Sequence, residues 1–310
     1  MPHASSYHAP VMVEEVLQYL QPERGGLYLD GTLGGGGHAE ALLERAPDAR
    51  LIGVDRDPDA LREAGHRLAR FGDRVRIVAS NYADAVEVAG VEPGSLAGAL
   101  LDLGISSHQI DATARGFTFR PGAPLDMRMG QGGEGVPGAA ELLNSLEETD
   151  LADLFYRFGE EKRSRRLARE IVRMREAAPL ATSDDLGSAI ERALPRPTPQ
   201  DRARIFQAVR IAVNGEIEGL EAALPRLREA LSAGGVLVVL SYHSLEDRVV
   251  KDSFRDWSRA CVCPPQLPVC RCRGVPLGET LTRKPVSAGE AEVLGNPRAR
   301  SAHLRAWRKQ

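Results

Sequence analysis

Residues 27–38 read Leu-Tyr-Leu-Asp-Gly-Thr-Leu-Gly-Gly-Gly-Gly-His. A short apolar run that ends in an acid, here Asp30, is typical of a buried parallel strand. The glycines from Gly34 to Gly37 predict a turn that a ligand can approach closely, because glycine has no side chain and tolerates positive φ. A helix is expected to start at His38, with its first N–H groups directed at that ligand. The pattern indicates a nucleotide-binding strand–turn–helix unit.

A second apolar strand, 51–55, ends in Asp55, 17 residues after His38. This is near the spacing at which a carboxylate receives the ribose hydroxyls of a nucleotide. The glycine turn fits both NAD and S-adenosylmethionine. Asp30 favours S-adenosylmethionine, because a carboxylate repels a pyrophosphate but attracts an ammonium and a sulfonium. We therefore expect S-adenosylmethionine as the cofactor, with a dinucleotide-dependent oxidoreductase as the alternative.

The composition sets outer limits on the class of protein. A length of 310 residues indicates one large domain with an insertion, or two domains. A net charge of −3 excludes a uniformly basic nucleic-acid coat but allows a local basic patch. No apolar run is long enough to span a bilayer. The first residues carry no secretory signal pattern, so the expected location is the cytoplasm.

A further predicted strand, 97–102, ends in Asp102. The carboxyl ends of parallel strands meet at one edge of a sheet, so Asp30, Asp55 and Asp102 should lie close together there. Like charges gathered in this way need a cationic partner, which a sulfonium ligand with an ammonium group would supply. Tyr82 follows the strand at 75–78 at the same edge. It is either a platform for an adenine or an ordinary half-buried tyrosine.

The alternation of strands and helices stops after about residue 116. Helices are predicted at 139–146, 149–158 (capped by Thr149), 160–177 and from Thr182 to 194. The segment from Arg157 to Arg175 carries eight basic and three acidic residues, a net charge of +5. It is either a nucleic-acid contact or a solvated helix face.

Residues 201–232 predict one long or kinked helix, followed by a buried strand at 236–240. At the exit of that strand, Ser244 and Asp247 fit a capping box for the next helix. His243 should lie near the ligand edge, where a catalytic or substrate-orienting role is open to it. Two more strands are predicted, at 278–283 and 302–307, with the last at the edge of the sheet.

All four cysteines lie between residues 261 and 272, as Cys261-x-Cys263 and Cys270-x-Cys272. Four thiolates could hold zinc, although the one-residue gaps are tighter than those of a usual zinc knuckle. The alternative is a loop of free thiols. A reducing compartment disfavours structural disulfides there. The sequence leaves the presence of a metal undecided.

Several sequence blocks together resemble one protein family. They are His8–Val11, Asp30–His38, Asp55–Pro58, Leu101–Ser107, Arg115–Phe117, Pro124–Met129, Gly159–Glu161, Phe206–Ile211, Ser241–Arg248 and Asn296–Ser301. In this order they are similar to the bacterial 16S ribosomal RNA cytosine N4-methyltransferases of the MraW type. The resemblance implies a Rossmann-like class I S-adenosylmethionine methyltransferase domain of α/β class, with an inserted all-helical domain after strand four. The implied boundaries are 1–112 and 205–310 for the methyltransferase domain and 113–204 for the helical substrate-recognition domain.

The resemblance also implies site residues and a reaction. The implied cofactor contacts are Gly36, Gly37, His38, Asp55, Tyr82, Asp102 and Gln109. The implied reaction methylates N4 of a cytosine in the decoding region of 16S ribosomal RNA within the small ribosomal subunit. The family often has His-Pro-Ala shortly before Phe-Gln-Ala, where this chain has Gln200-Asp201-Arg202. The cysteine pairs occur only in some members, so the resemblance implies no metal.

A cytosine N4 amine is a poor nucleophile, so a protein group must polarise it while its proton leaves. Asp102 is the first candidate for that group and His243 the second. The target base must be unpaired or flipped out to be reached. The alternatives are a methyltransferase that acts on DNA or protein and a non-catalytic RNA-binding assembly factor. The sequence does not indicate the oligomeric state.

Overall fold

The computed structural model describes residues 10–130, 136–263, 269 and 271–310. The chain forms two compact units, residues 1–104 with 217–310, and residues 105–216. The corresponding boundaries expected from the sequence were 112/113 and 204/205. In both divisions, a mainly helical segment interrupts a sheet-containing unit.

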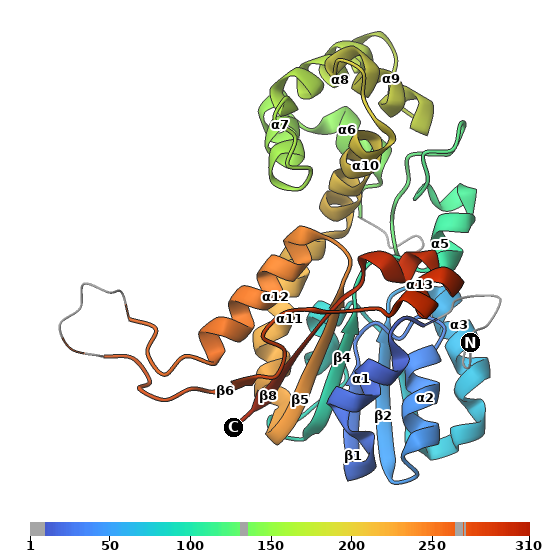
Figure 1. Cartoon of the computed structure of the whole chain (residues 1–310). Helices are drawn as coiled ribbons and strands as arrows, with labels where there is room; N and C mark the ends of the chain where they lie inside the picture. Colours follow the sequence, from blue (N-terminus) through green and yellow to red (C-terminus); the bar gives the residue numbers. More distant parts are fainter. Residues whose placement is uncertain (1–9, 131–135, 264–268, 270) are drawn as a thin grey trace. The chain divides into compact units, whose positions relative to one another are not determined.

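Eight strands, counted over the described ranges, form one sheet in the first unit (Figure 1). They are β1 (Gly26–Asp30), β2 (Ala49–Asp55), β3 (Val75–Ala79), β4 (Leu96–Asp102), β5 (Leu231–Ser241), β6 (Gly278–Thr280), β7 (Val286–Ser287) and β8 (His303–Lys309). Their order is β3-β2-β1-β4-β5-β8-β6, with β7 paired to β8. β1 to β5 run parallel, and β8 is antiparallel to both β5 and β6. This topology confirms the predicted Rossmann-like α/β class.

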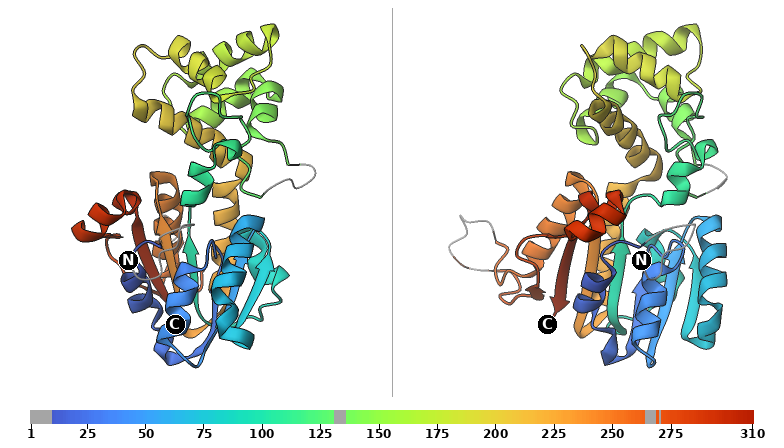
Figure 2. Two further views of the ribbon diagram at one scale, coloured as in Figure 1. Left: turned by 90° about the vertical axis from the view of Figure 1, so that its right-hand side faces the viewer. Right: turned by 45° about the vertical axis from the view of Figure 1, so that its right-hand side comes forward.

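Both faces of this sheet are buried, as expected for parallel strands between helical layers. Tyr28 and Leu100 pack into a core on one face, and their neighbours Leu29 and Leu101 pack into a second core on the other. Helices lie on both faces (Figure 2). The helices of this unit are α1 (Val13–Leu20), α2 (Gly37–Arg45), α3 (Pro58–Leu68), α4 (Ala85–Val88), α11 (Glu216–Ala230), α12 (Ser244–Trp257) and α13 (Glu290–Gly295).

The last strand differs from its prediction. We expected 302–307 to form an edge strand, but β8 lies between β5 and β6, so that prediction was wrong. Four consecutive residues of β8, from Leu304 to Trp307, are buried. A strand with neighbours on both sides and helices on both faces does not need a polar face, which explains this continuous burial.

The second unit is mainly helical and has its own hydrophobic core. Its helices are α5 (Ser107–Asp111), α6 (Ala139–Ser145), α7 (Glu148–Arg157), α8 (Ser164–Ala177), α9 (Ser183–Ala193) and α10 (Pro199–Asn214). α9 begins directly after its N-cap, Thr182, which agrees with the predicted start of a helix at Thr182. Thr149 does not cap α7, because the helix begins one residue earlier and its N-cap is Glu147. The predicted helix over 201–232 divides into α10 and α11 at Gly215, which has a left-handed φ of 57°.

Within the described part of the chain, no helix is both long enough and apolar enough to cross a membrane.

The tightest backbone approach in the second unit involves Gly116. Its φ is +73°, and a Cβ there would come within 2.3 Å of the Pro124 carbonyl oxygen. Gly122 has a similar φ of +76° but open space around its Cβ position. Gly116→Ala therefore combines left-handed strain with a backbone clash and should destabilise the unit by about 3 kcal/mol or more. Gly122→Ala should cost only about 1 kcal/mol.

Amide hydrogen exchange in α8, followed in the full chain, measures this difference within the helical unit. Gly116→Ala should speed exchange there by about 100-fold, and Gly122→Ala by no more than about tenfold. Equal exchange rates in the two variants would show that the close approach to Pro124 does not constrain the fold.

Candidate active site

The three acids predicted to share an edge of the sheet do so. Asp30, Asp55 and Asp102 are the last residues of β1, β2 and β4, and β1 pairs in parallel with both of the other strands. The sequence prediction that they lie at one edge is confirmed. The site is therefore built on the ends of three neighbouring strands, where a rigid sheet fixes each carboxylate.

Burial strongly changes the acidity of these carboxylates. It raises the pKa of Asp30 to about 7, against the opposing effects of His38 and of the Thr32 amide. It also raises the pKa of Asp102 to about 7, although a hydrogen bond from Tyr242 favours the ionised form. The pKa of Asp55 is raised by burial as well. The site thus holds acids that are poorly compensated by their own surroundings and suited to a ligand that brings positive charge.

The glycine turn crosses the ends of the strands beside β1. The Gly31 N–H donates to the Leu100 carbonyl of β4 at 2.9 Å, and the Leu33 N–H donates to the Val54 carbonyl of β2 at 2.9 Å. The Gly34 N–H donates to Asp55 Oδ2 at 2.8 Å. The other Asp55 oxygen, Oδ1, accepts from the Asp57 N–H at 2.9 Å. Each carboxylate oxygen keeps a further lone pair, so Asp55 can still accept hydrogen bonds from ribose hydroxyls.

The predicted contact glycines, Gly36 and Gly37, are also required by packing. Gly36 is the N-cap of α2 with a φ of +78°, and a Cβ there would lie 3.3 Å from Leu68. A Cβ on Gly37 would lie 2.8 Å from the ring of Pro10. Gly34, by contrast, would place a Cβ in open space, with only the Thr32 carbonyl oxygen nearby at 3.9 Å. The open side of the turn is therefore at Gly34, which the sequence analysis did not include among the contacts.

His38 lies between the N-terminal segment and Asp102. Its Nε2 is 2.8 Å from the Val11 carbonyl oxygen, and its Nδ1 is 3.7 Å from Asp102 Oδ2. Only 7% of the residue is exposed. The hydrogen bond to Val11 identifies Nε2 as the protonated nitrogen, so the ring joins residue 11 to the edge of the sheet.

Tyr82 and Gln109 are the two remaining predicted cofactor contacts. Tyr82 begins a short 3₁₀ helix after β3, and its Cβ lies 3.3 Å from the position that a Cβ on Gly31 would take. This places Tyr82 beside the start of the glycine turn. Gln109 belongs to the helical unit, where its Oε1 accepts from the Ser106 N–H at 3.0 Å in the capping box of α5. All predicted site residues except Gln109 thus belong to the sheet unit.

Asp102 is held by two hydroxyl groups. The Tyr242 hydroxyl donates to Asp102 Oδ1 at 2.7 Å, and the Asp102 N–H donates to the Thr32 hydroxyl at 2.6 Å. The sequence analysis assigned no role to Tyr242. A signal was present, because Tyr242 directly follows the strand that pairs with the Asp102 strand. Burial and the neighbouring Asp102 raise the pKa of Tyr242 well above its usual value, so the hydroxyl remains a donor.

His243 is connected to this group through Glu246. The Tyr242 N–H donates to Glu246 Oε2 at 2.9 Å, and Glu246 Oε1 lies 3.1 Å from His243 Nε2 without hydrogen-bond alignment. His243 is itself the N-cap of α12, and its Nδ1 accepts from the Glu246 N–H at 3.5 Å. The predicted capping box of Ser244 and Asp247 was therefore wrong. Ser244 is already the first helical residue, because the extended backbone ends at His243.

The arrangement as a whole is a cation-binding edge with a positioned carboxylate. Asp30 and Asp102 can balance a positively charged ligand, Asp55 can bind ribose hydroxyls, and Asp102 is oriented to accept a proton. His243 is less suited to that last role, because both of its ring nitrogens face Glu246.

Comparisons with known proteins identify relatives along the whole chain. The sequence profile of the MraW methylase family matches residues 5–310. The ribosomal RNA small subunit methyltransferase H of Gemmatimonas aurantiaca is 56% identical over 307 residues, which cover 98% of this chain and 95% of the relative. The protein of the same name from Geotalea uraniireducens is 49% identical, with 98% of each chain covered.

Solved structures give only a distant likeness. An rRNA methylase from Streptococcus thermophilus is 9% identical, with a TM-score of 0.43 over 96% of this chain and 95% of that one.

The raised pKa of Asp30 predicts a specific pH dependence of stability. Because its folded pKa of about 7 exceeds its ordinary value of 3.8, the folded state binds more protons than the unfolded state between these pH values. The stabilisation from protonated Asp30 is complete below pH 4 and is lost as the pH rises through 7. Between pH 5.5 and pH 8, the wild type should lose about 2 kcal/mol through this group.

Asp30→Asn should abolish that loss, because asparagine does not ionise and its oxygen can still accept from the Thr32 N–H, as Asp30 does at 3.1 Å. The measurement is the free energy of unfolding of the ligand-free protein at several pH values. Asp48→Asn, at an exposed aspartate of the same unit, is the control and should follow the wild type. If the stability of Asp30→Asn showed the same pH dependence as that of the wild type, the pKa of Asp30 would not be raised in the folded protein.

Proposed function

The chain belongs to the MraW methylase family, and we propose that it methylates N4 of a cytosine in the decoding region of 16S ribosomal RNA. Enzymes of this family are S-adenosylmethionine-dependent methyltransferases of ribosomal RNA, and this chain is one of them. The observation that carries the proposal is the match over residues 5–310, together with the complete set of acids at the carboxyl edge.

The residues of the sheet unit fit S-adenosylmethionine, the cofactor of this family. When bound, this cofactor supplies an activated methyl group on a positively charged sulfur. We propose that Asp55 accepts hydrogen bonds from its ribose and that the backbone at Gly34 and the side chain of Tyr82 border its nucleoside. Asp30 and Asp102 would balance its ammonium and sulfonium charges, which accounts for keeping buried acids at this edge.

Asp102 is the residue that we propose acts on the acceptor amine. The N4 lone pair of cytosine is delocalised into the ring, so the amine needs an acceptor for its proton as the new bond forms. The Tyr242 hydroxyl orients the Asp102 carboxylate, and the Thr32 hydroxyl accepts from the Asp102 backbone N–H. Such fixed orientation is what in-line transfer requires, since small displacements of the reacting groups are costly. In this proposal Tyr242 is a positioning residue and His243 fixes the start of α12.

The helical unit is proposed to recognise the RNA substrate. Seven of the eight basic side chains between Arg157 and Arg175 are exposed, whereas Arg175 is half-buried and donates to the carbonyl oxygens of Leu143 and Leu146. Several others are already engaged; Arg173, for example, pairs with Glu170 at 2.5 Å. Lys162, Arg163 and Arg165 make no ion pair within the described ranges. These three charges are therefore the most available for phosphate groups.

We further propose that the substrate is ribosomal RNA within the small subunit and that the reaction takes place in the cytoplasm. The relatives are named as methyltransferases of the small subunit's ribosomal RNA.

The reaction is tested by methyl transfer from labelled S-adenosylmethionine to small subunits that lack the modification. Naked 16S ribosomal RNA, duplex DNA and total protein serve as parallel substrates, and the product is identified by nucleoside analysis. N4-methylcytidine in small subunits is the expected product. Label in DNA or protein only, or intact cofactor binding without any transfer, would contradict the proposal in favour of another substrate or of a non-catalytic assembly factor.

Asp102→Asn should lower the rate of methyl transfer by about 10³-fold at saturating cofactor, because the amide cannot accept the amine proton as a carboxylate does. Near-wild-type transfer by this variant would remove Asp102 from the chemistry. Tyr242→Phe provides a second test. Loss of the hydrogen bond raises the pKa of Asp102, so the acid limb of the pH–rate profile should move to higher pH by about one unit.

Replacing Lys162, Arg163 and Arg165 with alanine should weaken RNA binding and reduce the slope of log affinity against log salt by about two to three. The control is the triple variant Arg62→Ala, Arg226→Ala and Arg255→Ala, which removes the same charge from exposed positions in the sheet unit. The control should keep the wild-type slope. Equal slopes for both triple variants would place the RNA contact elsewhere.

A further inference from the structure

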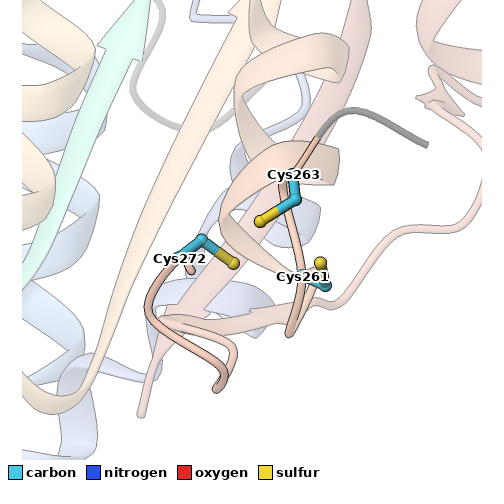
Figure 3. A group of neighbouring side chains, drawn as sticks. All are labelled: Cys261, Cys263 and Cys272. Carbon is cyan, nitrogen blue, oxygen red and sulfur yellow. The ribbon is translucent and has the colours of Figure 1, made fainter. Parts of the chain in front are cut away.

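The loop between α12 and β6 brings three cysteine side chains together. Cys261 and Cys263 lie on one arm of the loop and Cys272 on the other, and their sulfurs lie within 4.8 Å of one another (Figure 3). Of the four predicted ligands, Cys270 lies outside the described residues. We propose that Cys261, Cys263 and Cys272 bind a zinc ion.

The spacing of the sulfurs fits zinc closely. A zinc–sulfur bond of about 2.3 Å in tetrahedral geometry separates two sulfur ligands by about 3.8 Å. Three sulfurs within 4.8 Å need only a small contraction to reach that separation. A water molecule or another ligand would take the fourth position.

Backbone donors are arranged around two of the sulfurs. The Val262 N–H lies 3.4 Å from Cys272 Sγ on the opposite arm, and the Arg271 N–H lies 3.4 Å from Cys263 Sγ. Each arm thus donates to a cysteine of the other. Both N–H groups can also donate to a metal-bound sulfur, which would help to orient the two ligands.

Arginines around the loop add positive charge and hold its base. Arg273 donates to the carbonyl oxygen of Arg259 at 2.8 Å and to that of Val275 at 3.0 Å. Zinc with three thiolates has a net charge of −1, which the guanidinium groups of Arg259, Arg271 and Arg273 can offset.

Three apolar side chains in the described part of the loop are exposed. Val262, Val269 and Val275 are 44%, 67% and 60% exposed. A segment without a core of its own commonly depends on a covalent or metal crosslink. A zinc ion would link the two arms of the loop, which these exposed valines do not hold together.

The proposed metal is structural. α12 begins at the carboxyl edge of the sheet, next to the Tyr242–Asp102 contact, and its 14 residues extend for about 21 Å. The cysteines follow the far end of this helix, so they are too distant to act on the methyl group. The Leu277 N–H donates to the Trp257 carbonyl at 2.8 Å and closes the base of the loop just before β6.

The proposal is tested by the metal content of the full chain, purified under reducing conditions without chelator. We expect about one zinc per chain in the wild type. Cys261→Ser, Cys263→Ser and Cys272→Ser should each lower this content at least about fivefold. Val262→Ser is the matched control, since it changes an exposed side chain between two ligands and keeps the N–H donor; it should retain zinc.

Cobalt substitution provides a readout independent of activity. Wild type and Val262→Ser should show the thiolate-to-cobalt absorption of a tetrahedral site, and the three serine variants should lose it while still binding S-adenosylmethionine. Retained cofactor binding would show that the sheet unit remains folded. Wild-type protein with fully reduced thiols that binds neither metal, or serine variants that hold as much zinc as the wild type, would overturn the proposal.

Discussion

The burial of three carboxylates at one edge of a sheet is the constraint on which the site depends. Three parallel strands deliver Asp30, Asp55 and Asp102 to neighbouring positions, and burial raises the pKa of each. A fold selected for stability alone would avoid this arrangement, because it costs free energy at neutral pH. A ligand that carries positive charge removes the cost. The strain of the free protein and its affinity for S-adenosylmethionine are therefore two results of one arrangement.

The surroundings of these acids orient them without neutralising them. The carboxylates accept hydrogen bonds from the N–H groups of Thr32 and Gly34 and from the Tyr242 hydroxyl. None of these donors carries a positive charge. Such neutral donors fix the oxygens while leaving the charge for the ligand. His38 is the exception, because a charge on its ring lowers the pKa of Asp30 and its Nδ1 lies 3.7 Å from Asp102 Oδ2. The site is thus organised in advance for a cation.

Much of this could be predicted from the sequence, and the reasons are local. Apolar runs that end in Asp30, Asp55 and Asp102 predicted parallel strands, and parallel strands place their carboxyl ends together. Other features depend on partners that sequence patterns do not specify. The Ser244–Asp247 pattern fits a capping box, but the extended backbone ends at His243, so the helix begins one residue earlier than a Ser244 cap would require. The buried position of the last strand likewise depends on β6, a neighbour that precedes it in the sequence.

The link between Tyr242 and Asp102 joins residues 140 positions apart, so only the pairing of their strands reveals it. For Gln109, the family resemblance and the structure point to different roles. The family resemblance implies that it contacts the cofactor, whereas its amide oxygen serves the cap of α5 within the helical unit. Its contribution to the site remains a proposal. The spacing of the cysteines in the sequence did not decide whether zinc binds. The structure adds that the two arms of the loop bring the sulfurs of Cys261, Cys263 and Cys272 within 4.8 Å of one another.

The most direct test of the central claim is the number of protons released when S-adenosylmethionine binds. It is measured by calorimetry at pH 6.5 in buffers of different ionisation enthalpy. At this pH Asp30 and Asp102 are largely protonated in the free protein, and a cationic ligand should force them to ionise. We predict the release of about one proton or more per cofactor, falling toward zero above pH 8. Binding without proton release at pH 6.5, or with proton uptake, would contradict the account.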